Sequence, residues 1–357
     1  MGSYRYEILR ETTTDSLIME NNTREKKMNS NVYGIDLGTC NMKIYCKTSN
    51  KILNEKNTIA LVKKDQIYAY GDAAYAMYEK APETINVTFP VISGVIADFN
   101  NLQTMLQMYL EEHMKGKIRG AEFIVAVPTD ITDVEKRAFF EMFYKSKLKP
   151  KSVLLCEKPI ADAVGLGLDV NEPTGIMVVD IGADTTEISV ISLGGLVLSD
   201  LLHFGGNRID ESIITYVKRT YNLVIGQKTA QALKEKLGSG IPGNTETMVI
   251  VGRDVVSGLP IEMEITGEVV YEAIKDNLNS ICNSIKMILE KTPPELAADV
   301  ADRGIVLTGG GALLRGLEEL IEDRTGINTM TADDPMTCVA IGTGKYVEFL
   351  SGKRDDD

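Results

Sequence analysis

Residues 33–39, YGIDLGT, and residues 178–185, VVDIGADT, follow one pattern. In each, an apolar run ends in Asp, an apolar residue and Gly, and small or hydroxyl residues follow. A second β-rich run comes directly after each turn. The two aspartates, Asp36 and Asp180, are 144 residues apart, which is one domain length. The sequence therefore predicts two similar α/β domains around a cleft, each opening with a β-hairpin whose turn begins with Asp-x-Gly.

The segments around the first turn support an α/β domain. Apolar runs predict three short strands between residues 32 and 53, and helical spacing predicts a helix over residues 101–113. An all-apolar run at residues 123–127 predicts a buried parallel strand that Pro128 ends, and a helix is expected over residues 134–145. Strand, helix and strand in this order are typical of an α/β fold.

Composition sets the class of the protein. With 357 residues, 44% hydrophobic and 25% charged, the chain is globular and long enough for two or three domains. A net charge of -13 opposes binding to nucleic acid. No apolar run approaches the roughly 20 residues of a membrane span, and five scattered cysteines without a CxxC pair indicate reduced thiols. We expect a cytoplasmic protein with a flexible polar tail over residues 1–30.

A third motif lies at residues 307–312, LTGGGA, between an expected strand at residues 304–307 and an expected helix at residues 313–322. A glycine run at a strand-to-helix junction suits the phosphate or adenosine side of a nucleotide. It is neither a Walker A loop nor GxGxxG. One Asp-x-Gly turn alone is compatible with a plain hairpin. Two copies together with this glycine run favour a nucleotide site.

These motifs resemble the MreB family of bacterial actins, within the actin, Hsp70 and sugar-kinase superfamily, over residues 31–350. The resemblance implies an actin-like, ribonuclease H-like fold. It rests on residues 35–41 (first phosphate loop), 180–187 (second phosphate loop), 127–128 with 131–138 (start of the catalytic helix), 291–317 (adenosine segment) and 333–344 (last helix).

The resemblance also implies a domain plan with a smaller subdomain in each half. The expected parts are a tail (1–30), domain I (31–170, with a subdomain at about 55–94), domain II (171–334, with a subdomain at about 212–265) and a C-terminal helix that returns to domain I, with a short tail (335–357).

Site residues follow position by position from the same resemblance. The phosphates would contact Thr39, Cys40, Asn41, Gly182, Ala183, Asp184 and Thr185. The ribose or adenine would contact Gln231 and Lys234, and the adenosine would contact Gly310, Gly311, Ala312, Leu313 and Leu314. Hydrated Mg2+ would be held by Asp36 and Asp180, with Asp184 as a further ligand through water. Glu135 would orient the attacking water, so hydrolysis would rest on positioning and charge compensation.

Three departures from the family pattern bear on these roles. Ala183 and Asp184 replace part of a glycine-rich loop, and Gln231 stands where the family has a glutamate. The loop at residues 113–120 lacks paired large apolar residues, and its Met114 and Ile118 alternate with basic residues. A weak contact with an anionic membrane surface and a solvated loop are both compatible with it.

Several site residues also have a plain structural interpretation. Thr132-x-x-Glu135 matches a capping box, so the Glu135 carboxylate could simply bond back to the helix start. Asp36 and Asp180 could be turn formers at strand ends. Lys234 lies in a charged helix where a solvated face is the default. Asp184 either joins the hydrated metal or turns its side chain away from the phosphate.

The resemblance implies a nucleotide-driven filament protein that binds ATP, with GTP as the alternative base, and hydrolyses it slowly with magnesium. Its implied role is rod cell-shape determination and organisation of cell-wall synthesis. Implied partners are further copies of the chain and cell-shape and wall-synthesis membrane proteins, at the inner face of the membrane. A small-molecule kinase, an Hsp70-like chaperone and a non-polymerising nucleotide-binding module remain alternatives.

Overall fold

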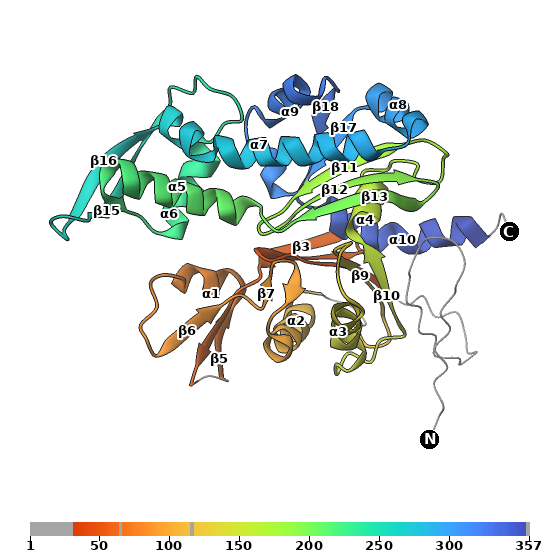
Figure 1. The fold of residues 1–357 in the computed structure, drawn as a ribbon. Helices are drawn as coiled ribbons and strands as arrows, with labels where there is room; N and C mark the ends of the chain where they lie inside the picture. Colours follow the sequence, from red (N-terminus) through yellow and green to blue (C-terminus); the bar gives the residue numbers. More distant parts are fainter. Residues whose placement is uncertain (1–30, 64–65, 115–117, 355–357) are drawn as a thin grey trace. The chain divides into compact units, whose positions relative to one another are not determined.

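The computed structural model describes residues 31–63, 66–114 and 118–354, so the expected tail at residues 1–30 lies outside the described part. The chain divides into two compact units (Figure 1). The first unit contains the chain up to residue 173, residues 191–196 and the chain from residue 336 onward. The second unit contains residues 174–190 and 197–335.

The first unit is built on a five-stranded sheet in the order β10-β9-β1-β2-β3. The three strands that open the chain pair antiparallel, and β9 and β10 add in parallel beyond β1. The buried parallel strand predicted before Pro128 is therefore confirmed. The strands are β1 (Val32–Leu37), β2 (Asn41–Cys46), β3 (Lys51–Lys56), β9 (Glu122–Val127) and β10 (Ser152–Glu157).

Helices cover both faces of this sheet. Figure 1 shows α2 and α3 on one side of it, and α4 and α10 on the other. Alternate residues of β1 and β9, such as Tyr33 and Phe123, are buried under α2 and α3 in one apolar core. The helices are α2 (Phe99–His113), α3 (Asp133–Tyr144), α4 (Lys158–Gly165) and α10 (Cys338–Arg354).

The C-terminal helix α10 contacts its neighbours through backbone. A Cβ on Gly342 would lie 1.7 Å from the Ala161 carbonyl oxygen of α4, and a Cβ on Gly34 of β1 would lie 2.4 Å from the Gly344 nitrogen. Side chains at these glycines would force the elements apart. The small residues thus seat α10 on the sheet directly behind the first Asp-x-Gly strand.

The second unit repeats the plan. Its sheet has the order β13-β12-β11-β17-β18, so a run of three consecutive strands is again extended, beyond its first strand, by two parallel strands. The predicted internal repeat is confirmed in strand order. The strands are β11 (Ile176–Ile181), β12 (Thr186–Ser192), β13 (Gly195–Leu202), β17 (Ile305–Thr308) and β18 (Thr329–Thr331).

The glycine run does not continue into the helix expected from residue 313. It forms a short 3-10 turn, η1 (Gly310–Leu313), and α9 (Leu317–Thr325) begins four residues later. The cause is Gly316, whose φ of +68° interrupts the helix, together with Arg315, whose carbonyl accepts a 2.7 Å bond from the Gly240 nitrogen. That expectation was wrong because a tertiary backbone contact ends the first turn.

Smaller elements complete each unit. The first unit adds α1 (Gly71–Met77), β4 (Ile59–Val62), β5 (Gln66–Tyr70), β6 (Ile85–Thr88), β7 (Val91–Ile92) and β8 (Val95–Ile96). The second adds α5 (Gly206–Tyr221), α6 (Gln227–Leu237), α7 (Gly267–Lys291), α8 (Pro294–Arg303), β14 (Leu223–Val224), β15 (Thr247–Asp254) and β16 (Pro260–Thr266).

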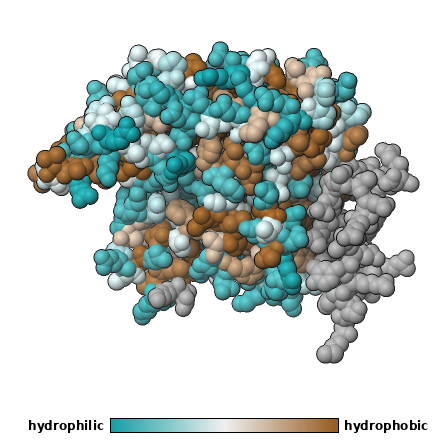
Figure 2. Space-filling view, viewed as in Figure 1, coloured by the Kyte–Doolittle hydropathy of each residue, from teal (hydrophilic) through white to brown (hydrophobic). Residues whose placement is uncertain are grey.

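Two surface features bear on contacts with other molecules. Figure 2 shows apolar side chains gathered on the projecting β15–β16 hairpin, where Val251, Val256 and Leu259 are each more than half exposed. Met114 and Ile118, by contrast, are buried in the core of the first unit, so they do not face solvent. Residues 115–117 between them lie outside the described residues. Met114 and Ile118 are therefore not exposed for the weak membrane contact that the sequence allows.

Candidate functional site

The first Asp-x-Gly turn joins β1 to β2 and is held by hydrogen bonds from a residue outside the turn. A Cβ on Gly38 would lie 2.8 Å from the Asn41 carbonyl oxygen, so the turn closes only with glycine there. Asn57, fully buried, donates its backbone N–H to the Cys40 carbonyl (2.9 Å) and its side-chain amide to the Gly38 carbonyl (2.8 Å). Sequence reasoning missed Asn57, because no local pattern ties it to the turn.

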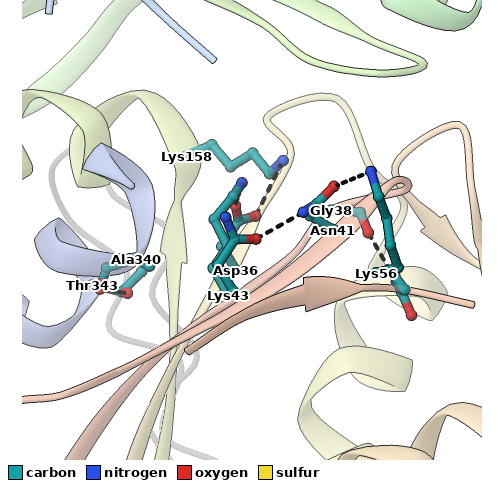
Figure 3. Close-up of polar contacts among 10 residues, drawn as sticks. Asp36, Gly38, Asn41, Lys43, Lys56, Lys158, Ala340 and Thr343 are labelled. Carbon is teal, nitrogen blue, oxygen red and sulfur yellow. Dashed lines mark hydrogen bonds and ion pairs between the residues drawn. The ribbon is translucent and has the colours of Figure 1, made fainter. Parts of the chain in front are cut away.

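Asp36, at the end of β1, lies between two lysines (Figure 3). Its Oδ2 is 3.0 Å from Lys43 Nζ and its Oδ1 is 3.5 Å from Lys158 Nζ. Lys43 is its cross-strand partner on β2, and Lys158 is the first residue of α4. Burial alone would raise the pKa of the Asp36 carboxyl, but the two lysine charges outweigh burial and hold this pKa below its usual value. The carboxylate is therefore ionised and held by two cations.

A third lysine lies on the other side of the same turn. Lys56 Nζ is 3.2 Å from Cys40 Sγ and 3.3 Å from Asn41 Oδ1 (Figure 3), and it stacks over the Tyr75 ring at 4.8 Å. The Asn41 amide donates to Asn54 Oδ1 at 2.8 Å. Two of the predicted phosphate-contacting residues are thus fixed in place by a cation.

The second Asp-x-Gly turn joins β11 to β12 and is braced by a helix. The Gly182 N–H donates to the Thr185 carbonyl (2.8 Å), and a Cβ on Gly182 would lie 3.1 Å from that oxygen. The first amides of α5, Gly206 N–H and Asn207 N–H, donate to the carbonyls of Gly182 (3.0 Å) and Ala183 (2.8 Å). The carbonyls of both turns are therefore occupied by groups from elsewhere in their own units.

Asp184 is held on one side of this turn. Its Oδ1 accepts a 2.7 Å bond from the Asn207 side-chain amide. Sequence reasoning missed Asn207; the glycine pair before it, at the start of a helix, is the signal that could have suggested a contact. The contact fixes the direction of the carboxylate, and its predicted metal role stays a prediction.

Asp180 is the second-last residue of β11 and lies beside the glycine run. A Cβ on Gly309 would lie 2.2 Å from Asp180 Oδ1, and Gly309 has φ of +78°, so only glycine leaves room for the carboxylate. Thr308 is the parallel-strand partner of Asp180. Its buried hydroxyl has no hydrogen-bond partner among the described residues. Both residues lie at the carboxyl ends of parallel strands, the usual ligand end of an α/β sheet.

The two aspartates differ in their fit to the magnesium ion that the family resemblance implies. Both oxygens of Asp36 lie within ion-pair distance of ammonium groups, and its side chain is only 4% exposed, so two lysine charges already stand where a cation would bind. Asp180 is half-buried, and Gly309 beside its carboxylate has no side chain. Asp180 therefore fits a hydrated magnesium, and Asp36 in this arrangement does not.

The adenosine segment is assembled within the second unit. A Cβ on Gly311 would lie 2.2 Å from Ile181 Cγ2, so η1 packs on the end of β11. Leu314 packs on Gly238 at the end of α6, where a Cβ would lie 2.7 Å from its Cδ1. Leu313, at 59% exposure, projects to the surface. The structure thus brings the predicted 310–314 segment next to the helix that carries Gln231 and Lys234.

Of the two site residues predicted on α6, Lys234 does not lie on the solvated face that its charged helix indicates. Its Nζ pairs with Asp210 (2.9 Å) and donates to the Gly206 carbonyl (3.0 Å). Burial raises the pKa of Asp210 to about 6, against the opposing charge of Lys234. Gln231 donates to Glu235 Oε1 at 2.7 Å on the exposed side of the helix. Lys234 therefore ties α6 to the start of α5, directly behind the second turn.

Glu135 forms the capping box that its spacing indicates. Its Oε2 accepts from the Thr132 N–H (2.7 Å) and hydroxyl (2.8 Å), while its own N–H donates to Thr132 Oγ1 (3.3 Å). The structural role of Glu135 is confirmed, and its role in orienting water stays a prediction.

The described residues contain neither a group of metal-binding side chains nor a helix suited to crossing a membrane. Within residues 31–63, 66–114 and 118–354, no three His, Cys, Asp or Glu side chains gather as a metal-binding group. Across the same described part of the chain, none of the helices combines the length and the apolar character that crossing a bilayer requires.

Comparison with known proteins shows the family of this chain. The model of the MreB/Mbl protein family matches residues 30–354. The cell shape-determining protein Mbl of Bacillus subtilis (strain 168) is 41% identical over 320 residues, covering 89% of this chain and 96% of the relative. The cell shape-determining protein MreB of Escherichia coli (strain K12) is 42% identical over 332 residues, covering 90% and 95%. The crystal structure of MreB5 of Spiroplasma citri bound to AMPPNP superposes with a TM-score of 0.87 at 32% identity, covering 92% and 99%. The chain therefore belongs to the MreB/Mbl family of actin-like proteins.

Proposed function

We propose that this chain is an actin-like cytoskeletal protein of cell shape that binds an adenine nucleotide, assembles into filaments and hydrolyses ATP slowly. Membership of the MreB/Mbl family supports the cell-shape role, and the AMPPNP-bound relative supports the nucleotide. The observation that carries the proposal is the repeated Asp-x-Gly turn, closed by glycine and braced through its carbonyls in both units.

The phosphates would bind at the two turns. Small side chains at residues 39–41 and 182–185 leave the backbone accessible to an anion, and backbone amides of such turns are suited to phosphate. The adenosine would lie against the 310–314 segment and the exposed side of α6, near Gln231 and Leu313. ATP is the proposed nucleotide, and GTP is the competitor that a binding assay must exclude.

Asp180 would hold a hydrated magnesium beside the phosphates, since it fits the ion and Asp36 does not. The ion would supply positive charge for the phosphate oxygens. Asp184, fixed by Asn207, would add a second carboxylate through water. No covalent nucleophile is needed, because positioning and charge compensation suffice for this reaction class.

Glu135 would orient the attacking water, and its capping contacts make this testable. Glu135→Ala should lower hydrolysis about a hundredfold with ATP affinity nearly unchanged. Thr132→Val is the matched control, since it removes the capping hydroxyl at Thr132 Oγ1 and keeps the carboxylate. If both variants hydrolyse ATP like the wild type and lose only about 1 kcal/mol of stability, Glu135 is a helix cap and no more.

Assembly is tested with the purified full-length chain. Incubation with ATP and magnesium at tens of micromolar should give filaments by electron microscopy and a pelletable fraction by sedimentation, because a head-to-tail contact that does not close forms open polymers. Monomers or closed rings alone would refute the filament proposal. We also propose contact with cell-shape and wall-synthesis membrane proteins at the inner face of the membrane, which pull-down from cells expressing them would test.

A further inference from the structure

We propose that Lys234 is a positioning residue: through the start of α5 it holds the second Asp-x-Gly turn in place for a phosphate, and it does not itself contact the nucleotide. All of the elements involved belong to the second unit, where α5 and α6 pack against one another. The inference rests on the proposed nucleotide binding and deepens it. It replaces the ribose or adenine contact that the family resemblance implies for Lys234.

One peptide group lies between α6 and the second turn. Its carbonyl, on Gly206, accepts a 3.0 Å hydrogen bond from Lys234 Nζ. Its N–H, on Asn207, donates to the Ala183 carbonyl of the turn at 2.8 Å. An ammonium donor polarises the peptide group, so it also strengthens the hydrogen bond at the opposite end. Lys234 therefore acts on the turn through a single peptide group.

The first two residues of α5 hold the second turn through backbone and side chain. The Gly206 N–H donates to the Gly182 carbonyl at 3.0 Å, beside the bond from the Asn207 N–H to Ala183. The Asn207 side-chain amide donates to Asp184 Oδ1 at 2.7 Å. A shift at the start of α5 would therefore change the direction of the turn's own amides, and a phosphate binds well only where such amides are already oriented.

The ammonium group of Lys234 is fixed in this position. It lies 2.9 Å from Oδ1 of Asp210, whose side chain is 2% exposed. Burial raises the pKa of Asp210 to about 6, so this carboxylate is ionised at neutral pH. A Cβ on Gly206 would lie 3.1 Å from Lys234 Nζ, so the missing side chain makes room for the ammonium. Moving the ammonium to a nucleotide would leave a buried carboxylate without its cation, which is unfavourable.

The carboxyl end of α6 is attached separately to the adenosine segment. Leu314 packs on Gly238, where a Cβ would lie 2.7 Å from its Cδ1, and the Arg315 guanidinium donates to the Lys236 carbonyl. These contacts do not involve the Lys234 side chain. Loss of the Lys234 ammonium should therefore loosen the turn and leave the adenosine segment in place.

The first measurement needs no nucleotide. Amide hydrogen exchange at Gly206 and Asn207 is followed by NMR in the wild type, Lys234→Met and Lys236→Met. We expect exchange there to be about tenfold faster in Lys234→Met, the effect of losing one charge-assisted hydrogen bond. Lys236→Met is the matched control, because Lys236 is an exposed lysine two residues further along the same helix. Its exchange should stay within about twofold of the wild type.

The second measurement separates positioning from direct contact. With magnesium present, the affinities of adenosine and of ADP are measured for the same three proteins by competition with a fluorescent ADP analogue. We expect Lys234→Met to bind ADP about tenfold more weakly and adenosine within about twofold of the wild type. If Lys234→Met does not fold by circular dichroism, Lys234→Gln replaces it, because it removes the charge and keeps a hydrogen-bond donor.

The outcomes distinguish the inference from the proposed function. Adenosine and ADP weakened by the same factor would show that Lys234 contacts the ribose or the base, and would overturn the inference. Unchanged exchange, or faster exchange with the ADP affinity of Lys236→Met, would also overturn it while the wild type still binds nucleotide. Faster exchange in Lys234→Met, together with a wild type that binds neither adenosine nor ADP, would support the hold of Lys234 on the turn and refute the proposed function.

Discussion

The first and second Asp-x-Gly turns share a backbone and differ in charge. In both turns a glycine, Gly38 or Gly182, packs against the carbonyl oxygen of the residue three positions later. Residues outside each turn donate hydrogen bonds to its backbone carbonyls. Around the first turn the side chains are basic: Lys43, Lys56 and Lys158. At the second turn they are acidic, since Asp184 is part of it and Glu187 stands in the sequence place that Lys43 has in the first.

The two copies of the repeat therefore have the same backbone geometry and opposite side-chain charges. A turn surrounded by fixed cations can bind phosphate directly, because the protein itself supplies the charge. A turn surrounded by carboxylates repels phosphate unless a metal ion reverses the sign. The two turns therefore differ in the charge that each could present to a phosphate, and the following variants test that difference.

The largest effect is expected at the glycine that makes room for Asp180. Gly309→Ala should destabilise the protein by about 4 kcal/mol, because its φ of +78° is unfavourable for alanine and its Cβ would lie 2.2 Å from Asp180 Oδ1. Gly310→Ala is the matched control: nothing lies within 4 Å of its Cβ position. Denaturant unfolding should separate the two variants clearly. Equal midpoints would show that a Cβ at position 309 is accommodated beside Asp180.

Replacing Asp36, which pairs with Lys43 and Lys158, should lower the free energy of unfolding by somewhat less. Asp36→Asn leaves Lys43 and Lys158 close together without their carboxylate, and we expect a loss of about 3 kcal/mol at pH 7. The lowered pKa means that this stabilisation is present above the unfolded value near 4 and is lost as pH falls through the folded value. Unfolding free energies at pH 7 and pH 3 should therefore converge between variant and wild type. A constant gap down to pH 3 would contradict the ion-pair account.

The ion pair behind the second turn should show the opposite pH dependence. Because burial raises the pKa of Asp210 to about 6, its contribution to stability falls as pH rises from about 4 to 6 and is constant above. Lys234→Met removes the charge that opposes this shift, so the fall should continue above pH 6, with a loss of about 2 kcal/mol at pH 8. Thermal unfolding from pH 5 to 8 tests this, and a variant parallel to the wild type throughout would refute the pair.

The smallest effect is expected at Asp184. Asp184→Gly loses the 2.7 Å bond from Asn207, worth about 1 kcal/mol, and should also weaken the magnesium dependence of ATP binding and slow hydrolysis. Asn207→Ala is the control that loses the same bond and keeps the carboxylate. If Asp184→Gly binds ATP more tightly than Asn207→Ala at every magnesium concentration, the carboxylate is only a repulsive neighbour of the phosphate.

Local patterns in the sequence predicted much of the fold. The paired turns, the three consecutive strands and the Thr132–Glu135 capping box each depend on residues within one or two elements, so their spacing was sufficient. Lys43 was predictable in principle, because a tight turn after Asp36 makes the two residues cross-strand partners.

Contacts between distant segments were not predictable from those patterns. Lys158 follows Asp36 by 122 residues, and the parallel pairing of β9 with β1 and of β10 with β9 brings them together. The same holds for Asn57 behind the first turn and for Lys234 beside Asp210, where charge pattern alone favoured a solvated face. Chemistry at a site is thus set by tertiary pairing that single-sequence periodicity does not encode.

The position of a bound metal ion distinguishes Asp180 from Asp36 as its ligand. A crystal structure of the full chain with AMPPNP and Mn2+, with anomalous data at the manganese edge, locates the ion without reference to activity. We predict one anomalous peak linked through water to Asp180, with Lys43 and Lys158 still paired with Asp36. A peak whose waters contact Asp36, with either lysine displaced from it, would contradict the account.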